Sequence, residues 1–364
     1  MYIKYKTLLY KMGIRYLNSY LRDNCPKSIR VMNMSDLSGK KIAIDISIYL
    51  YKYESDNVLL ENIYLMLSIF RHYNVIPIFI FDGKPPPEKK ELLIKRKTDK
   101  KEAQQEYYTL KTSLENNEDY DDSEKQDIIN AMDQLKKQFV HINKYKTEQV
   151  KSLIRAYGAT YYDAPGEADE LCASLVLKKI VWACMSEDMD LFVYGCTRVL
   201  RYFSLINHSV VLYYMKGILE ELDISQKEFK DICILSGTDY NIHANTGMGK
   251  NKNHDINLFE TLKLFQKYKD TNKEKEKEKE KEKEKEKDKD TNKSNKKDTF
   301  YNWLQNNTDY ISDLELLENI NRMFDLTTEH CNLDNFRHIK IINGPIIDSC
   351  IQEIMREEGF LFVK

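Results

Sequence analysis

Short apolar runs that end in acidic residues constrain this 364-residue chain more than any other feature. The runs are Lys41–Ser47, Val75–Phe81 and Val181–Met185. Each has the length and apolar content of a buried strand, and helical periodicity separates them. Asp45 closes the first run, Asp82 follows the second and Asp188 follows the third. The pattern predicts an α/β fold with a mostly parallel central sheet flanked by helices, in which these carboxylates share one edge.

A second acidic group opens a predicted helix. Glu167 and Asp169 lie in the first turn of a helix whose apolar positions, from Ala168 to Val176, repeat with helical spacing. The helix macrodipole alone explains acidic residues in a first turn, and an acidic loop after a strand is ordinary, so either cluster taken singly has this simpler reading. Residues that are two positions apart on a helix do not share a face, so Glu167 and Asp169 can converge only where the loop becomes a helix.

Seven carboxylates stand at predicted strand or helix ends: Asp45, Asp82, Glu167, Asp169, Asp188, Asp190 and Asp239. Bringing so many anions together is unfavourable unless cations neutralise them. A ligand set made only of oxygens suits Mg²⁺ or Mn²⁺ rather than zinc. Two such ions ~3.5–4 Å apart clamp a phosphodiester and activate water.

A basic segment, residues 88–157, separates the second strand from the acidic helix and is predicted to overhang the strand ends. Lys89, Arg96 and Lys100 are spaced by seven and four residues, so they share one helical face. Lys144 belongs to a helix predicted over Phe139–Tyr157, and residues 113–127 are predicted to be a polar link. Such a stripe binds nucleic-acid phosphates or is a solvated face; the spacing alone leaves both open.

Near residue 250 the chain offers a glycine turn, Gly247-Met-Gly249-Lys250, before a helix predicted around Leu258–Tyr268. Its backbone amides could hold a phosphate, and the alternative is a plain turn. The Lys/Glu-rich tract at 273–288 is low in complexity, and is either a solvated helix or disordered. Residues 299–364 look helical and contain no recognisable site.

Composition limits the class of protein further. The 56 basic and 58 acidic residues nearly cancel, so net charge indicates no partner. Seven cysteines without a CxxC pair are typical of reduced thiols in an intracellular protein, and argue against zinc. No apolar run is long enough for a membrane span, and the N-terminus lacks a secretory signal. The sequence leaves a nuclear location and a cytoplasmic viral replication site both open.

Five motifs in order carry a family resemblance: IAIDIS (42–47), FDGKPP (81–86), APGEADELCA (164–173), SEDMDLFVYG (186–195) and LSGTDY (235–240). With these motifs the chain resembles the flap endonuclease branch of the XPG family of structure-specific 5′ nucleases, from Met12 to about Lys250. The resemblance implies a 5′-nuclease (PIN-like) fold. It divides the chain into an N-terminal extension (1–11), an N-terminal nuclease region (12–101), a helical arch or gateway (102–157), an internal nuclease region (158–235), a helix–two-turn–helix region (236–270), a low-complexity insertion (271–298) and a helical C-terminal region (299–364).

The resemblance also implies roles for the acidic residues. Asp45, Asp82, Glu167 and Asp169 would serve mainly one metal ion, with Asp169 standing where the family more usually has Glu. The other ion would be served mainly by Asp188, Asp190 and Asp239, partly through water. Both ions would be Mg²⁺, with Mn²⁺ as a substitute.

Further roles follow from the same resemblance. Lys89 and Arg96 match the basic pair that steadies the scissile phosphate. Tyr51 matches the aromatic that stacks on the base beside the cut, although Tyr49 and Tyr53 are rivals and core packing is the alternative for each. The helix–two-turn–helix would grip duplex DNA, with Gly247, Gly249 and Lys250 in its turn and a K⁺ site there. Lys100 and Lys144 would contact the substrate.

The expected activity is Mg²⁺-dependent hydrolysis of DNA near a single-strand/duplex junction, removing 5′ flaps and degrading from 5′ ends. A nuclease for four-way junctions or bubbles, and a catalytically silent DNA-binding scaffold, are the alternatives. The expected partner is branched or flapped DNA, and the expected state is a monomer. No sliding-clamp box is recognisable, because Gln352 and Met355 are followed by Glu358 and Gly359 where aromatics are needed.

Overall fold

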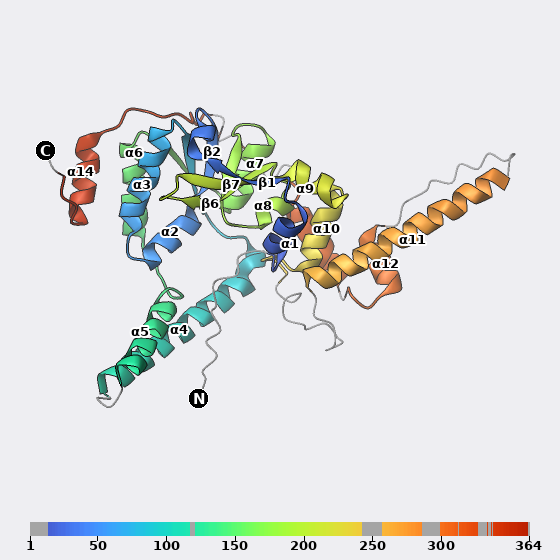
Figure 1. Cartoon of the computed structure of the whole chain (residues 1–364), viewed down its shortest axis with the longest axis horizontal. Coiled ribbons are helices and arrows are strands. Elements are labelled where there is room, and N and C mark those ends of the chain that lie inside the picture. Colours follow the sequence, from blue (N-terminus) through green and yellow to red (C-terminus); the bar gives the residue numbers. More distant parts are fainter. Residues whose placement is uncertain are drawn as a thin grey trace.

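A seven-stranded sheet forms the centre of the molecule (Figure 1). The structure is a computed structural model that describes residues 14–116, 121–241, 257–285, 299–311, 313–326, 333, 336 and 338–362. The strands lie in the order β1-β7-β6-β5-β2-β3-β4. They are β1 (Ile29–Asn33), β2 (Lys41–Asp45), β3 (Ile76–Phe81), β4 (Thr160–Asp163), β5 (Ala183–Met185), β6 (Arg198–Ser204) and β7 (Ser209–Tyr214).

Strands β6, β5, β2, β3 and β4 are neighbours in the sheet and run parallel. At one edge, β7 runs antiparallel to both of its neighbours, β6 and β1. The predicted mostly parallel sheet is therefore confirmed. Register aligns the strand ends, since Asp45 on β2 lies opposite Ile80 on β3 and Ile44 lies opposite Met185 on β5. The residues that follow β2, β3 and β5 therefore emerge at the same edge.

Helices cover both faces of the sheet (Figure 1). One face packs on α2 (Ile46–Ser55), α3 (Leu59–His72), α6 (Lys144–Ala156) and α14 (Asp348–Glu357). The other packs on α1 (Leu17–Asn24), α7 (Ala168–Leu177), α8 (Asp190–Val193), α9 (Met215–Leu222) and α10 (Gln226–Ser236), with α12 (Phe300–Asn307) and α13 (Leu314–Met323) beyond them. Alternation along β2 feeds both cores, because Ile42 and Ile44 face one and Ala43 the other.

Two helices form a hairpin that projects from the body (Figure 1). They are α4 (Lys90–Asn116), which follows a short 3₁₀ turn at Pro87–Lys89, and α5 (Asp122–Lys136). The link predicted over 113–127 is wrong, because these helices take up all of it except residues 117–121. The acidic residues there form a capping box that starts α5. The Asp121 carboxylate accepts a hydrogen bond from the Glu124 amide at 2.7 Å, and the Glu124 carboxylate accepts one from the Asp121 amide. The predicted start of the next helix at Phe139 is also wrong, since Asn143 caps α6.

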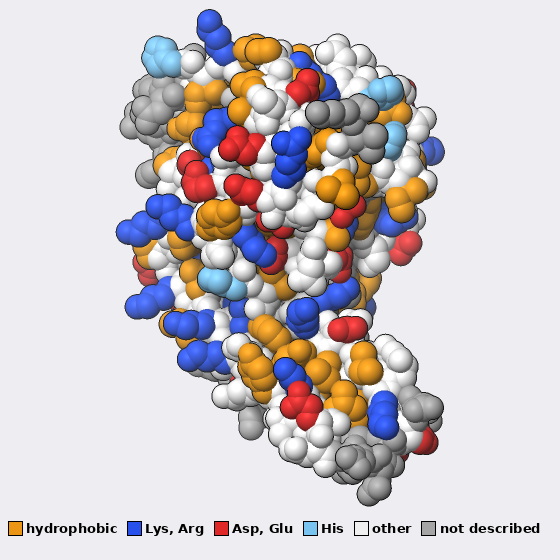
Figure 2. Space-filling view, turned by 90° about the vertical axis from the view of Figure 1, so that its left-hand side faces the viewer, with side chains coloured by type: hydrophobic (Ala, Val, Ile, Leu, Met, Phe, Trp, Pro, Cys, Tyr) orange, Lys and Arg blue, Asp and Glu red, His pale blue; other side chains and the backbone are white. Residues whose placement is uncertain are grey.

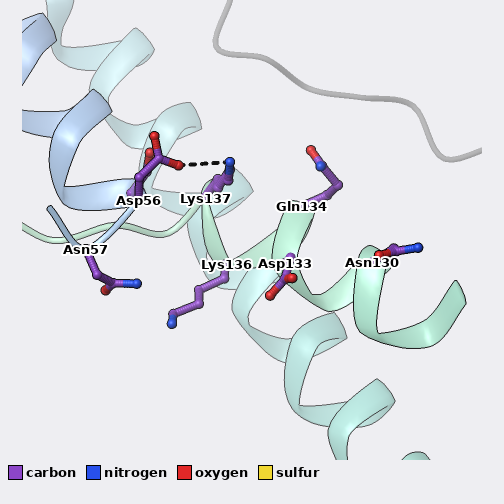
Figure 3. Close-up of a pocket in the computed structure, with 8 residues that line it drawn as sticks. Asp56, Asn57, Asn130, Asp133, Gln134, Lys136 and Lys137 are labelled. Atoms are coloured by element: carbon purple, nitrogen blue, oxygen red, sulfur yellow. Dashed lines mark ion pairs between the residues drawn. The ribbon is translucent and has the colours of Figure 1, made fainter. Parts of the chain in front are cut away.

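The base of the hairpin is attached to the body by ion pairs. Lys137, just after α5, contacts Asp56 in the turn between α2 and α3 at 2.9 Å, and Lys146 on α6 pairs with Glu54. Figure 3 shows the Asp56–Lys137 pair beside a polar cleft of about 420 Å³, lined by the α2–α3 turn and the last turns of α5. These contacts hold the base of the hairpin, where α5 ends, against the helices that cover the sheet.

The Lys/Glu-rich tract continues a helix as far as it is described. Helix α11 (Leu258–Lys285) begins against α10 and α12 and then extends away from the body (Figure 1). Of the two predicted states of the tract, the described backbone is helical through Lys285. Residues 242–256, which include Gly247, Gly249 and Lys250, lie outside the described residues. Within the described ranges, no helix is both long and apolar enough to cross a bilayer.

A C-terminal strap, residues 340–347, ties α14 to the body. The Gly344 amide donates to the Gly158 carbonyl at 2.7 Å, the Ile347 amide donates to the Ala156 carbonyl at 2.7 Å, and Arg71 Nη2 donates to the Gly344 carbonyl at 2.5 Å. The strap delivers Ile351 and Met355 of α14 into the core on the α2–α3–α6 face. The C-terminal region is thus a structural part of the sheet domain.

We expect Gly158→Ala to loosen this strap. Gly158 has φ +69°, and a Cβ there would lie 2.5 Å from the Gly344 backbone, so both strain and collision oppose the substitution. Chemical denaturation should show a loss of about 2 kcal/mol or more, with faster proteolysis near residue 344. Gly39→Ala is the matched control: Gly39 has φ +71° but nothing within 4 Å of a Cβ, so it should lose only about 1 kcal/mol. Equal losses in both variants would contradict the role of the close approach.

Candidate active site

The acidic side chains that follow the parallel strands are connected by serine hydroxyls. Asp45, the last residue of β2, caps α2 by accepting from the Ser47 amide at 3.2 Å. The Ser47 hydroxyl donates to Asp82, just after β3, at 2.5 Å. Ser186, just after β5, donates from its hydroxyl to the other oxygen of Asp45 at 2.9 Å. The ends of three neighbouring strands are therefore joined through Asp45.

The loop after β5 carries two further carboxylates inward. The Ser186 hydroxyl accepts from the Asp188 amide at 3.1 Å, and the Asp188 carboxylate accepts from the Asp190 amide at 2.9 Å. Asp190 opens α8 and is completely buried. Both of its carboxylate oxygens have no hydrogen-bond partner among the described residues. A buried carboxylate in this state requires a cation or a proton nearby.

The start of α7 brings Glu167 and Asp169 to the same edge. Glu167 is the N-cap of α7, and Asp169 is buried in the first turn. Asp82 fixes this junction, because its carboxylate accepts from the Ala168 amide at 2.9 Å. The structure thus places Glu167 and Asp169 at the transition from loop to helix, where the sequence analysis expected them to converge.

Two cations from the base of the hairpin enter the cluster. Lys89 Nζ lies 2.7 Å from Glu167 and 3.7 Å from Asp239, which follows α10. Arg96 Nη2 donates to Asp239 at 2.9 Å. Lys89 is itself buried, so this amine is held inside the acidic group and not at its rim. The first turns of α4 are thereby locked over the strand ends.

Burial and mutual repulsion shift the pKa values of these groups together, because they share one electrostatic environment. Burial, together with Asp82 and Asp188, raises the pKa of Asp45 to about 8. Burial and neighbouring carboxylates also raise the pKa values of Asp169, Asp188 and Asp190. Burial lowers the pKa of Lys89, but Asp169 and Glu167 outweigh it and the net direction is upward. Negative charge is therefore in excess, and Lys89 stays charged.

The residues fit hard divalent cations. All seven candidate ligands are carboxylates, the charge they carry exceeds that of Lys89 and Arg96, and the Asp190 oxygens have no hydrogen-bond partner within the described chain. The same residues are not arranged as a finished ligand set: in the described ranges, no three Asp, Glu, His or Cys side chains already form a group that could hold a metal. Lys89 instead holds Glu167 in an ion pair.

The three candidate tyrosines differ in how far their side chains are buried. Tyr49 and Tyr53 are buried in the core, whereas Tyr51 is 47% exposed. Burial and Asp82 raise the pKa of Tyr51, which places its ring near the acidic group. Lys100 Nζ lies 5.1 Å from the centre of the Tyr51 ring. Of the three, Tyr51 alone can meet a ligand beside the carboxylates.

The predicted substrate lysines have different positions. Lys100 lies on α4 beside Tyr51 and donates to the Val140 carbonyl at 3.2 Å. Lys144 is exposed at the start of α6, and within the described part of the chain no contact joins it to the acidic group. Sequence reasoning missed Ser47, Ser186 and Tyr240. The Tyr240 hydroxyl donates to Glu167 at 2.5 Å and its ring lies 4.8 Å from Lys89 Nζ. Each lies inside or beside a quoted motif, and that adjacency was the available signal.

Comparison with known proteins identifies the family. Residues 12–103 match the XPG N-terminal domain, and residues 158–239 match the XPG I-region. The chain belongs to the XPG family. Flap endonuclease 1 of Nematostella vectensis is 30% identical over 263 residues, an alignment that covers 67% of this chain and 66% of the relative. The chain thus spans just under two thirds of that relative's length, and it groups with the flap endonuclease branch.

Solved structures agree on the fold of this XPG chain. Flap endonuclease-1 from Methanococcus jannaschii superposes with a TM-score of 0.57 at 20% identity, covering 95% of this chain and 93% of that one. The catalytic core of Rad2 in complex with DNA substrate gives a TM-score of 0.57 at 16% identity, covering 93% and 94%. At these identities the similarity establishes the 5′-nuclease fold and nothing further.

We expect the metal-free protein to lose stability as pH rises from about 4 to about 8. A carboxyl group whose pKa is raised by folding keeps its proton in the folded state and loses it in the unfolded chain, so raising the pH favours unfolding. The window follows from Asp45, whose pKa moves from 3.8 to about 8. Thermal denaturation in EDTA across this range measures the effect.

Asp190→Asn should stabilise the metal-free protein at pH 8 by about 1–3 kcal/mol and flatten this pH dependence, because the substitution removes a buried charge. Asp23→Asn, at an exposed position on α1, is the control and should change neither. A melting temperature that rises with pH between 5 and 8, or a destabilised Asp190→Asn at pH 8, would contradict this account.

Proposed function

We propose that this chain is a structure-specific 5′ nuclease that hydrolyses DNA phosphodiesters at single-strand/duplex junctions. It would remove 5′ flaps and act as a 5′–3′ exonuclease. The observation that carries the proposal is the convergence of carboxylates from β2, β3, β5, α7 and α10 beneath a projecting helical hairpin, with Lys89 and Arg96 among them. The relatives named flap endonuclease 1 and the Rad2 core bound to DNA substrate support the same class.

Magnesium is the cofactor that this donor set favours, with Mn²⁺ as a substitute. Asp45, Asp82, Glu167 and Asp169 would hold mainly one ion, and Asp188, Asp190 and Asp239 mainly the other. When bound, the two ions supply an activated water and stabilisation of the leaving 3′ oxygen. The buried, mutually repelling carboxylates are suited to this role because hard cations relieve the repulsion.

The remaining residues would bind and orient the DNA. Lys89 pairs with Glu167 and Arg96 pairs with Asp239, so a scissile phosphate entering the site would compete with these carboxylates for the two cationic groups. The half-exposed ring of Tyr51 would stack on the base next to the cut. Such stacking is tolerant of sequence, as recognition of DNA structure requires.

The hairpin favours a substrate with a free 5′ end. Helices α4 and α5 pack on each other through Ala103, Ala131 and Leu135, and ion pairs anchor the hairpin base to the body. A short or unstructured arch would suit continuous strands, and α4 with its 27 residues is neither. A silent scaffold is disfavoured, since a protein that only binds DNA gains nothing from burying Asp169 and Asp190.

We expect Asp188→Asn to lower the rate of 5′-flap cleavage in Mg²⁺ by about 1000-fold, because losing a metal ligand removes several kcal/mol of transition-state stabilisation. Asp163→Asn is the matched control, since Asp163 also ends a strand at this edge but is 56% exposed and pairs with Lys151. That variant should cleave at nearly the wild-type rate. Wild-type cleavage by Asp188→Asn would reject the proposed function.

Tyr51→Ala should lower kcat/KM on the flap substrate by roughly 5- to 100-fold, the loss expected from one base-stacking contact. Tyr51→Phe keeps the ring and should stay within about twofold of wild type. If Tyr51→Phe loses as much as Tyr51→Ala, the hydroxyl and not the ring would be the functional group.

A further inference from the structure

One edge of the central sheet is open along β1. The neighbour of β1 in the sheet is β7, and the strand order places β1 at the end opposite β4. The edge formed by β4 is covered by C-terminal residues, because the Thr160 hydroxyl donates to the Lys340 carbonyl at 3.1 Å and the Tyr162 ring packs edge-on against Phe336. In the part of the chain that the structure describes, no backbone segment pairs with the outer side of β1. Proteins protect such an edge or use it to bind another chain.

The hydrogen-bond pattern shows which backbone groups of β1 point outward. The Tyr214 amide donates to the Ser28 carbonyl at 2.9 Å, just before β1. The Met34 amide donates to the His208 carbonyl at 2.9 Å, just after it, and the register with β7 is unbroken between these two bonds. Hydrogen-bonded pairs alternate with non-hydrogen-bonded pairs along an antiparallel ladder. The even-numbered residues of β1 therefore pair with β7, and the odd-numbered residues direct their backbone groups away from the sheet.

The odd-numbered residues of β1 are Ile29, Val31 and Asn33. The Asn33 amide confirms the outward direction, because it donates to the Asp36 carboxylate at 3.1 Å. Among the described residues, the backbone amides and carbonyls of Ile29 and Val31 have no hydrogen-bond partner. The Val31 side chain is also 71% exposed. The middle of β1 thus presents a free donor, a free acceptor and an apolar side chain to solvent.

Exposed hydrophobic side chains also occur elsewhere, so exposure alone does not distinguish this edge. Figure 2 shows a group of them on the projecting hairpin. There the backbone groups are hydrogen-bonded within α4 and α5, so a partner would meet side chains alone. At β1 the backbone and a side chain are both available, and an added strand uses this combination.

Charge restricts the kind of strand that fits. Arg30 is exposed within β1 and Lys27 is exposed just before it, and neither forms an ion pair within the described chain. A second copy of β1 fits poorly, because an antiparallel pairing centred on Val31 would make the two Arg30 side chains diagonal neighbours on one face, where like charges repel. A carboxylate in the same position would attract Arg30. The edge is therefore complementary to an acidic strand.

We propose that the open edge of β1 binds an extended acidic peptide of a partner protein, which adds an antiparallel strand to the sheet. The peptide backbone pairs with Ile29 and Val31, its carboxylates face Arg30, and its apolar side chains lie beside Val31. Strands β7 and β6 separate β1 from β5, so the peptide lies outside the sheet strands that lead into the candidate metal ligands, at a distance of about 14 Å or more. This interaction surface is separate from the proposed nuclease site and does not rest on the proposed function.

The test measures peptide binding by the full chain. The probe is a fluorescein-labelled peptide of about eight residues that alternates Glu and Val, so that one face of the strand is acidic and the other apolar. A peptide with Lys in place of Glu is the charge control. Val31→Pro removes the outward amide and keeps the hydrogen bonds to β7, because Val31 makes none of them. Val31→Thr keeps both the amide and the branched shape and is the matched control, and Arg30→Glu tests the charge.

Fluorescence anisotropy at low salt should show that wild type binds the Glu/Val peptide about tenfold more tightly than the Lys/Val peptide. Val31→Pro should lose about fivefold or more in affinity for the Glu/Val peptide, because one hydrogen bond is lost and the proline ring meets the partner strand. Val31→Thr should stay within about twofold of wild type. Arg30→Glu should reverse the preference between the two peptides. Amide hydrogen exchange at Ile29 and Val31 should slow when the Glu/Val peptide is bound.

Equal affinities of wild type and Val31→Pro for the Glu/Val peptide would overturn the proposal, since the peptide would then not use the backbone edge. An unchanged peptide preference in Arg30→Glu, or no binding by wild type, would also overturn it. Analytical ultracentrifugation covers the other occupant: a wild-type dimer that Val31→Pro abolishes would assign the edge to a second copy and reject the acidic peptide. Melting temperatures report whether each variant folds. If Val31→Pro does not fold, the charge reversal in Arg30→Glu, at an exposed position, decides the outcome.

Discussion

Repulsion among buried carboxylates is the constraint on which the rest of this structure depends. Asp45, Asp169, Asp188 and Asp190 are each nearly or fully inaccessible to solvent, and their charges raise one another's pKa values. Most proteins avoid such an arrangement because its free energy is strongly unfavourable without compensation. Here Lys89 supplies part of that compensation from inside the cluster, which explains why its amine is buried.

The compensation couples the hairpin to the sheet. Lys89 and Arg96 belong to the hairpin base, and their partners Glu167 and Asp239 belong to the body, so the position of α4 follows the charge state of the cluster. Cations bound by these carboxylates, as proposed above, would weaken the hold of the body on Lys89, and so would a phosphate that attracts the amine. On the proposed function, occupancy of the site and the placement of the hairpin would be linked through these ion pairs.

The sequence predicted the parts of this structure in which burial is continuous. Strands β2 and β3 are uninterrupted apolar runs, so their ends, and with them Asp45 and Asp82, could be located. Strands β1 and β4 were missed because they form the sheet edges and are partly exposed, so no long apolar run marks them. Strand β7 does carry an apolar run, Val210–Leu212, which the sequence analysis did not identify. The start of α5 was predicted as a link because the acidic and polar residues of a capping box resemble those of a loop.

Within the site, residue type could be predicted but orientation could not. Tyr49, Tyr51 and Tyr53 have the same chemistry at alternating positions, and only packing shows that Tyr51 faces outward. Lys144 has the same side chain as Lys89 but is exposed in the first turn of α6, whereas Lys89 is buried among the carboxylates. The roles of Ser186 and Tyr240 depend on contacts across more than 70 residues of chain, which local patterns do not encode.

The C-terminal strap has a consequence for biosynthesis. Because Ile351 and Met355 complete the core over α6, and Gly344 closes against Gly158, the helical layer on that face stays unfinished until the strap has left the ribosome. During translation the α2–α3–α6 face is therefore an open apolar surface that nascent-chain chaperones can recognise. Folding of this domain therefore requires that the strap has been synthesised, so a chain truncated before residue 340 would leave this apolar face uncovered and prone to aggregation.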